Sequence, residues 1–185
     1  MAVGSLTLVL GGSGSGKSEV AERMAASCGE PVTYLATAAA GDGEMQQRIE
    51  RHRRRRPQEW RTGEETHALA EAVGRWGRDT AVLLIEDLTT WLANLLTDEN
   101  WPRPSVPDDV RDEAIGAEIG NLLAAVERVP ARVIVVACEV GCGLVPAYPL
   151  GRAFRDLAGR ANQIVAGQAG RVYLVVAGLA VALKE

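Results

Sequence analysis

The sequence predicts an α/β protein in which a mainly parallel central sheet is flanked by helices in three layers. Short apolar runs rich in Val, Leu and Ile alternate with longer segments of helical period along the 185 residues, and this alternation is typical of parallel strands joined by helices. No linker or internal repeat interrupts the pattern, and a chain of this length suits one domain with one core. We therefore expect a single domain over residues 1–185.

The expected elements follow the apolar runs and the helical periods in chain order. Strands are expected at residues 6–10, 32–36, 81–85, 132–137 and 171–176. Helices are expected at residues 17–27, 44–55, 65–76, 88–96, 108–128 and 150–166. Residues 98–109 contain three prolines, which prevent regular structure, and we expect a loop there.

A glycine-rich segment joins the first expected strand to the first expected helix. It consists of Gly11, Gly12, Ser13, Gly14, Ser15, Gly16, Lys17 and Ser18. The order fits G-x-x-x-x-G-K-[ST], and the preceding strand and following helix are the context that this pattern requires. Successive backbone N–H groups and a helix N-terminus favour a bound polyphosphate, whereas a merely flexible turn would need neither flank. The sequence thus predicts a P-loop NTPase-like fold that binds a nucleoside triphosphate.

A lysine, a hydroxyl residue and an acid complete such a site. Lys17 would reach the β- and γ-phosphates, and the Ser18 hydroxyl would bind Mg²⁺. An acid is also needed at the end of a neighbouring apolar strand, and the run VLLIED ends on Glu86 and Asp87. We prefer Glu86, the first residue beyond the apolar run, as the acid of the metal site. Asp87 is the second candidate, and it is equally suited to cap the helix expected from Leu88.

An arginine-rich segment surrounds one of the two histidines. Six arginines occupy the nine positions from 48 to 56, with His52 at the centre. The ordinary interpretation of such a run is a solvated helix face. In a protein that handles polyphosphates, arginines also clamp phosphate oxygens, and a neutral imidazole beside them can attack phosphorus and leave again. The pattern alone leaves both interpretations open; the other histidine, His67, is expected at the surface.

Charge and cysteine usage limit the class of protein. The net charge of −4 argues against a dedicated nucleic-acid binder. Three cysteines, odd in number and without paired CxxC spacing, favour a reducing compartment. The N-terminal apolar stretch is too short for a signal peptide, and the longest apolar run, residues 172–183, is too short to span a membrane. We therefore expect a cytoplasmic protein without a membrane span or a nucleic-acid partner.

Six segments carry a resemblance to a known family. In chain order they read GGSGSGKS, YLATA, EMQQRIERHRRRRPQEWRTGEE, VLLIEDLTTWLANLL, EVGCGLVP and FRDLAGRANQ. Together they resemble the bifunctional adenosylcobinamide kinase/adenosylcobinamide-phosphate guanylyltransferase family of cobalamin biosynthesis. The resemblance implies that the corrinoid alcohol first takes the γ-phosphoryl group of ATP or GTP. GTP then donates GMP to a histidine with loss of pyrophosphate, and adenosylcobinamide phosphate displaces the histidine to give adenosylcobinamide-GDP.

The resemblance also implies roles for individual residues. The guanylylated histidine falls on His52, and Arg51, where many members have a second histidine, leaves His52 as the acceptor. Ser18 and Glu86 would hold Mg²⁺, and members assemble as homotrimers. Beyond the P-loop, the family's nucleotide contacts fall on Ala36, Thr37, Ala38, Arg53, Arg54, Arg55, Arg56, Glu64 and Glu86.

Two further positions depart from the family pattern. Gly14 stands where the loop usually carries an arginine, and Cys138 where an asparagine is usual. The missing loop arginine removes one phosphate contact from the kinase half of the activity. Two other classes stay open on the sequence: a plain P-loop kinase, which would transfer γ-phosphate without releasing pyrophosphate, and a non-catalytic nucleotide-binding module, which would do neither.

Overall fold

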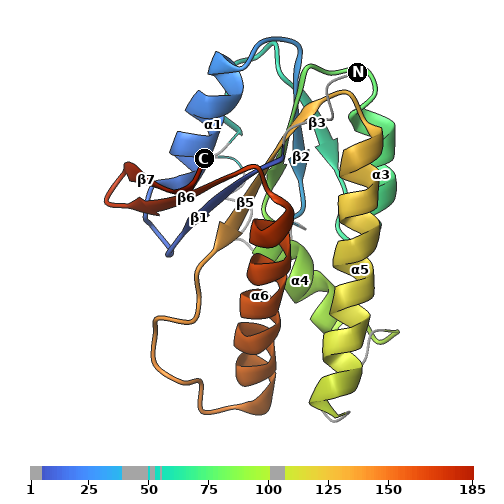
Figure 1. Ribbon diagram of the computed structural model, residues 1–185, viewed down its shortest axis with the longest axis vertical. Coiled ribbons are helices and arrows are strands. Elements are labelled where there is room, and N and C mark those ends of the chain that lie inside the picture. The colour runs from blue at the N-terminus through green and yellow to red at the C-terminus, as the bar shows by residue number, and fades with distance from the viewer. Residues whose placement is uncertain (1–5, 39–49, 51–52, 55, 101–106) are drawn as a thin grey trace.

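A seven-stranded sheet forms the centre of the molecule (Figure 1). The computed structural model describes residues 6–38, 50, 53–54, 56–100 and 107–185. The strand order is β3-β2-β4-β5-β1-β6-β7, and every neighbouring pair is parallel except β6 and β7. The expected mainly parallel α/β fold is therefore confirmed. The strands are β1 (Leu6–Gly11), β2 (Val32–Ala36), β3 (Arg61–Glu64), β4 (Val82–Glu86), β5 (Arg132–Cys138), β6 (Arg171–Val176) and β7 (Leu179–Lys184).

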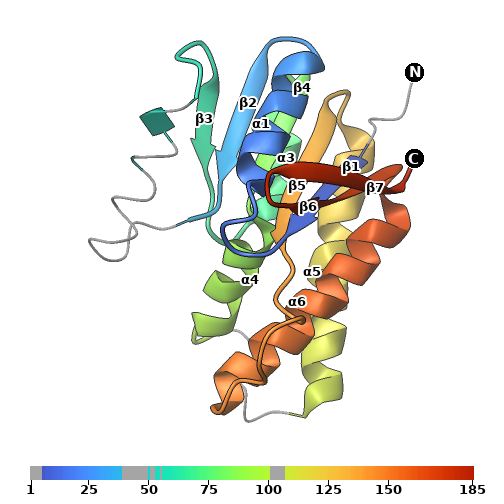
Figure 2. The same ribbon diagram turned by 90° about the vertical axis from the view of Figure 1, so that its left-hand side faces the viewer.

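Helices cover both faces of the sheet, but unequally. They are α1 (Lys17–Ser27), α3 (Leu69–Trp76), α4 (Leu88–Thr97), α5 (Asp108–Arg128) and α6 (Pro149–Gln168). In Figure 1, α1 lies on one side of the sheet and α3, α5 and α6 lie on the other. The view turned by 90° places β3 and β7 on opposite sides of the molecule (Figure 2), as the strand order requires.

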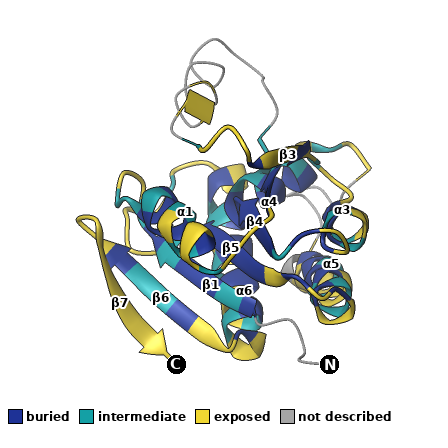
Figure 3. Cartoon of the chain, turned by 90° about the horizontal axis from the view of Figure 1, so that it is seen from above, coloured by how far each residue is buried: buried dark blue, intermediate teal, exposed yellow. Residues whose placement is uncertain are grey.

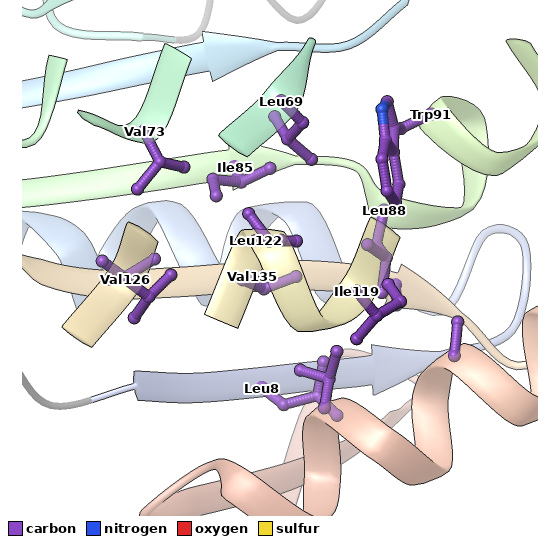
Figure 4. Packing of buried hydrophobic residues seen from close by; sticks show 14 of the residues in the cluster. Leu8, Leu69, Val73, Ile85, Leu88, Trp91, Ile119, Leu122, Val126 and Val135 are labelled. Carbon is purple, nitrogen blue, oxygen red and sulfur yellow. The ribbon is translucent and has the colours of Figure 1, made fainter. Parts of the chain in front are cut away.

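Alternating side chains of the strands build one apolar cluster on each face. In β5, Val133 and Val135 belong to the larger cluster, and Ile134 and Val136 belong to the smaller one. The larger cluster joins the sheet to α3, α4, α5 and α6, and Figure 4 shows its packing around Leu122 and Trp91. The smaller cluster lies under α1 and includes Trp60. Because strands of a parallel sheet are buried on both faces, they appear as unbroken apolar runs in the sequence.

Two strands of the sheet are absent from the sequence prediction. β3 has the sequence RTGE, in which only Gly63 is buried, and all six residues of β7 are exposed. β3 lacks the apolar run or alternation that marks a strand in a sequence, whereas β7 (LAVALK) continues the apolar run of residues 172–183, in which only one strand, ending at residue 176, is expected. Both are edge strands and add little to the core.

The helix expected from residue 65 begins only at Leu69. The Glu65 carboxylate accepts hydrogen bonds from the amides of His67 and Ala68, at 3.0 and 2.9 Å, so a side-chain turn takes the place of the first helical turn. The predicted helix at residues 44–55 lies mostly outside the described residues, where only residues 50, 53 and 54 are assigned as helical. In the described part of the chain, none of the helices is both long and apolar enough to cross a membrane.

Candidate nucleotide-binding site

The P-loop lies at the carboxyl edge of the sheet, where β1 turns into α1. Gly11 ends β1, and a Cβ atom there would meet the Ser15 hydroxyl and the backbone oxygen of Val175. Gly14 and Gly16 have φ angles of 70° and 87°, in the left-handed region that favours glycine. Three glycines of the motif are therefore required by the conformation of the loop itself.

The two polar residues that follow these glycines are buried at the start of α1. Lys17 and Ser18 are only 4% and 7% exposed. The Lys17 ammonium group lies 3.5 Å from the Gly12 carbonyl oxygen, so it points back over the loop. This is the position from which a lysine contacts the phosphates that such a loop holds.

Ser18 contacts Glu86, which lies 68 residues further along the chain, as the motif and the strand-end acid predict. The Ser18 hydroxyl donates to Oε1 of Glu86 at 2.5 Å. The other carboxylate oxygen, Oε2, is buried and has no hydrogen-bond partner among the described residues. Burial, and then the charge of Asp87, raise the pKa of Glu86 to about 8. A hydroxyl beside an unsatisfied carboxylate oxygen is a hard oxygen donor pair, which suits Mg²⁺.

Asp87 serves as the cap of α4. Its Oδ1 atom accepts a hydrogen bond from the Thr90 amide at 2.6 Å, which satisfies one of the free amides of the first helical turn. This confirms the capping interpretation, and it leaves Glu86 as the carboxylate that faces Ser18.

The segment from Ala36 to Ala38 is fixed to the carboxyl end of β4. The Thr37 amide donates to the Glu86 carbonyl oxygen at 3.0 Å. The Thr37 hydroxyl donates to the Asp87 carbonyl oxygen and accepts from the Asp87 amide, each at 2.8 Å. Thr37 is fully buried, whereas Ala36 and Ala38 are half-buried. Within this predicted nucleotide contact, the Thr37 side chain therefore holds the ends of β2 and β4 together, and Ala36 packs against the smaller apolar cluster.

Cys138 ends β5 beside Lys17. Its amide donates to the Thr89 hydroxyl at 2.6 Å, and its carbonyl oxygen accepts from the Asn162 side chain at 3.1 Å. Burial raises the pKa of the thiol, the charge of Asp87 raises it further, and Lys17 opposes both. The thiol is therefore neutral next to the P-loop lysine.

The structure describes part of the arginine-rich segment, and in that part the Arg56 side chain contacts both Tyr34 and Thr62. The Arg56 guanidinium carbon lies 3.6 Å from the centroid of the Tyr34 ring, and one guanidinium nitrogen donates to the Thr62 hydroxyl at 3.4 Å. Tyr34 is a buried residue of β2, and burial followed by the charge of Glu86 raises the pKa of its phenol. Tyr34 therefore lies between the carboxylate of the P-loop site and the arginine segment. Sequence reasoning missed it, because it is one residue of an apolar run.

The other predicted residues of this segment are less constrained. Arg53 and Arg54 are exposed, and Arg54 pairs with Glu50 at 3.0 Å. His52 and Arg55 lie outside the described residues. Glu64 is exposed at the end of β3, opposite Ala36 of β2 in the register.

A cavity of about 420 Å³ opens beside β3 at the arginine segment. Arg53, Arg54 and Arg56 line it together with Trp60 and Thr62. Three guanidinium groups at one concave surface suit a phosphate-bearing ligand. The cavity lies on the β2–β3 side of the sheet, apart from the P-loop on β1, and Glu50, the partner of Arg54, also lines it.

The mainly parallel sheet carries a strand–P-loop–helix unit, and the site contains a buried lysine and a serine–glutamate pair. These features define a P-loop protein that binds nucleoside triphosphates. Comparison with known families matches residues 7–183 to the cobinamide kinase / cobinamide phosphate guanyltransferase family. The chain belongs to this family, and the resemblance seen in the sequence is confirmed.

Curated relatives are similar to this chain along nearly its whole length. The chain is 43% identical to the bifunctional adenosylcobalamin biosynthesis protein CobU of Escherichia coli, covering 97% of this chain and 99% of the relative. It is 44% identical to the bifunctional adenosylcobalamin biosynthesis protein CobP of Pseudomonas aeruginosa, covering 96% of each. It is 39% identical to the CobU protein of Salmonella typhimurium over 97% of this chain and 99% of the relative. The expected enzyme class is therefore confirmed, against the plain kinase and the non-catalytic module.

Proposed function

We propose that this protein phosphorylates adenosylcobinamide at the P-loop and then transfers GMP from GTP to adenosylcobinamide phosphate through His52. The observation that carries the kinase half is the contact between Ser18 and Glu86, with its unsatisfied Oε2 atom. The guanylyl half rests on the family and on the arginine-lined cavity that adjoins the His52 segment.

In the kinase half, the loop amides hold the phosphates and Lys17 neutralises the β–γ region. Ser18 and Glu86 would hold Mg²⁺, which supplies charge neutralisation on the β- and γ-oxygens when it is bound. Glu86 must lose its proton to act as a ligand, and the nearby Lys17 charge favours that loss. The γ-phosphorus is attacked by the corrinoid hydroxyl oxygen, and the bond to the β–γ bridging oxygen breaks.

In the guanylyl half, a neutral His52 nitrogen attacks the α-phosphorus of GTP and pyrophosphate leaves. A phosphate oxygen of adenosylcobinamide phosphate then attacks the same phosphorus, and the histidine leaves. Each step needs alignment and charge stabilisation more than covalent assistance. Arg56 is suited to this task, since the Tyr34 ring and Thr62 fix its guanidinium group.

The proposal includes a cytoplasmic location and a homotrimer. The three cysteines are all free, as is usual in a reducing compartment. The apolar side chains Leu179, Val181 and Leu183 of the edge strand β7 are exposed, which suits burial against another subunit.

The test is to assay both reactions in one preparation. We expect phosphoryl transfer from ATP to adenosylcobinamide, and pyrophosphate release from GTP when adenosylcobinamide phosphate is present. Lys17→Ala should lower phosphoryl transfer by at least about 100-fold, because a positioned charge is lost from the transition state. Phosphoryl transfer without any pyrophosphate release would contradict the proposal and identify a plain kinase.

A further inference from the structure

The connection from β5 to α6 leaves the sheet beside the P-loop and is held at both of its ends. At its start, the Glu139 amide donates to the carbonyl oxygen of Gly11, the first P-loop residue, at 3.1 Å. At its end, the Arg152 guanidinium group donates to the carbonyl oxygens of Pro146 and Ala147 at 3.1 and 2.8 Å. Figure 1 and Figure 2 show that this connection and the first turns of α6 project beyond the carboxyl ends of the strands. The connection therefore has a defined place next to the P-loop edge of the sheet.

Apolar side chains of this connection and of the start of α6 face solvent. Leu144 is 97% exposed and Val145 is 64% exposed, and Tyr148 and Leu150 are exposed as well. Single exposed apolar residues are ordinary on a protein surface, but a group of four on one connection is typical of a surface that binds a ligand or a partner. We call these four residues the apolar edge.

A cavity of about 460 Å³ adjoins the apolar edge and lies between α5 and α6. Figure 3 shows both helices on the face of the sheet opposite α1. The charged lining residues are Arg111 and Asp112 of α5, and Arg152 and Asp156 of α6. Asp156 pairs with Arg155 through Oδ1 at 3.2 Å, which leaves its second carboxylate oxygen for a ligand. Because arginines and aspartates balance, the α5–α6 cavity suits an uncharged group that both donates and accepts hydrogen bonds, and a phosphate would meet two carboxylates.

Helix α6 connects the α5–α6 cavity to the P-loop. The Asn162 side chain donates to the carbonyl oxygen of Cys138 at 3.1 Å, and Cys138 pairs with Gly11 in the register of the sheet. Asp156 and Arg152 precede Asn162 on the same helix, which places them about 9 and 15 Å along the helix axis from this contact. A ligand bound at the cavity can therefore extend a flexible arm to the P-loop.

We propose that the apolar edge and the α5–α6 cavity bind the corrin ring of adenosylcobinamide during phosphoryl transfer. This inference rests on the proposed function of the P-loop. A corrinoid is an apolar macrocycle with carboxamide side chains on its rim, and each carboxamide both donates and accepts hydrogen bonds. The apolar edge contacts the ring and its methyl groups, and the charged residues of the cavity bind the carboxamides. The hydroxyl group that takes the phosphoryl group lies at the end of a flexible arm, which reaches from the ring to the P-loop.

The test measures binding of adenosylcobinamide by equilibrium dialysis in the presence of MgADP, so that the P-loop is occupied and no phosphoryl group is transferred. The variants are Leu144→Ser/Val145→Ser in the apolar edge and Asp156→Ala in the cavity. We expect the double variant to bind the corrinoid about tenfold more weakly, because apolar contact is lost. Asp156→Ala should bind it about fivefold more weakly, because a carboxamide loses its acceptor. The affinity of both variants for MgADP, measured by calorimetry, should stay unchanged, since the replaced residues are exposed and outside the P-loop.

The matched control is Asp79→Ala, which removes an exposed aspartate at the amino end of β4, on the opposite edge of the sheet. We expect this control to bind both ligands like the unchanged protein. Unchanged corrinoid affinity in either test variant, or equal weakening of corrinoid and MgADP, would overturn the inference. Dissociation of the Leu144/Val145 variant into smaller species in sedimentation would also overturn it, and would assign the apolar edge to a second copy of the chain. If the unchanged protein bound MgADP but no adenosylcobinamide, the proposed function itself would be wrong.

Discussion

Glu86 holds a proton near neutral pH in the folded protein, since burial raises the pKa of its carboxyl to about 8. The unfolded chain gives up this proton near the ordinary value of 4.5. Between these two pH values the folded state binds more protons than the unfolded state, so the free energy of unfolding falls as pH rises. Above about pH 8 both states are ionised, and this contribution levels off.

Glu86→Gln removes this dependence, because the amide stays neutral and can still accept from Ser18. We expect the variant to gain stability relative to the unchanged protein between pH 6 and pH 9. The measurement is urea unfolding at several pH values in the presence of EDTA, so that no metal ion occupies the site. If the free energy of unfolding changed with pH in the same way in both proteins, Glu86 would already be ionised in the folded state.

Some residue-scale features follow from the sequence and others do not. The Ser18–Glu86 contact and the Asp87 cap are predictable, because the P-loop motif and a strand-end acid both carry local signals. Tyr34 carries no such signal, since its role depends on Arg56 reaching its ring from a segment 22 residues away. That contact is tertiary, and nothing in the apolar run around Tyr34 distinguishes it from a core residue.

At the scale of elements, the P-loop depends on how tightly it packs onto β1 and β6. A methyl group on Gly11 would meet the Ser15 side chain and the backbone of Val175, whereas a methyl group on Gly12 would meet nothing within 4 Å. Both residues belong to the same motif, but only one is enclosed.

We therefore expect Gly11→Ala to lower the free energy of unfolding by about 1–3 kcal/mol, the usual range for overpacking. Gly12→Ala is the matched control and should change it by less than about 0.5 kcal/mol. Urea unfolding of both variants makes the comparison. Equal destabilisation would mean that the loop does not close onto β6 as described.

The elements that sequence missed are those with little buried surface. β3 buries only Gly63 and has no hydrophobic period, whereas β7 is apolar but buries no side chain, so its sequence merges with the apolar run of β6. The late start of α3 depends on a carboxylate that competes for backbone amides, which outweighs the helical period of the segment. The central strands were predictable, because burial on both faces gives them unbroken apolar runs in the sequence.

At the scale of the whole molecule, the P-loop and the arginine-lined cavity stand on different strands of the sheet. The P-loop stands on β1, and the arginine-lined cavity stands at β3, with β2, β4 and β5 between the two strands. Tyr34 on β2 contacts the Arg56 guanidinium group, and the charge of Glu86 contributes to the raised pKa of its phenol. The proposed function assigns phosphoryl transfer to the P-loop and guanylyl transfer to the arginine-lined cavity.

The central claim is that His52 carries GMP between GTP and the corrinoid. The most direct measurement is intact-protein mass spectrometry after incubation with GTP and Mg²⁺. His52→Ala is the test variant, and His67→Ala is the matched control, because His67 is exposed and lies 3.5 Å from Asp98, outside both surfaces. The account predicts an acid-labile GMP adduct on the unchanged protein and on His67→Ala, and none on His52→Ala. An adduct that persists in His52→Ala, or no adduct on a protein that binds GTP, would contradict it.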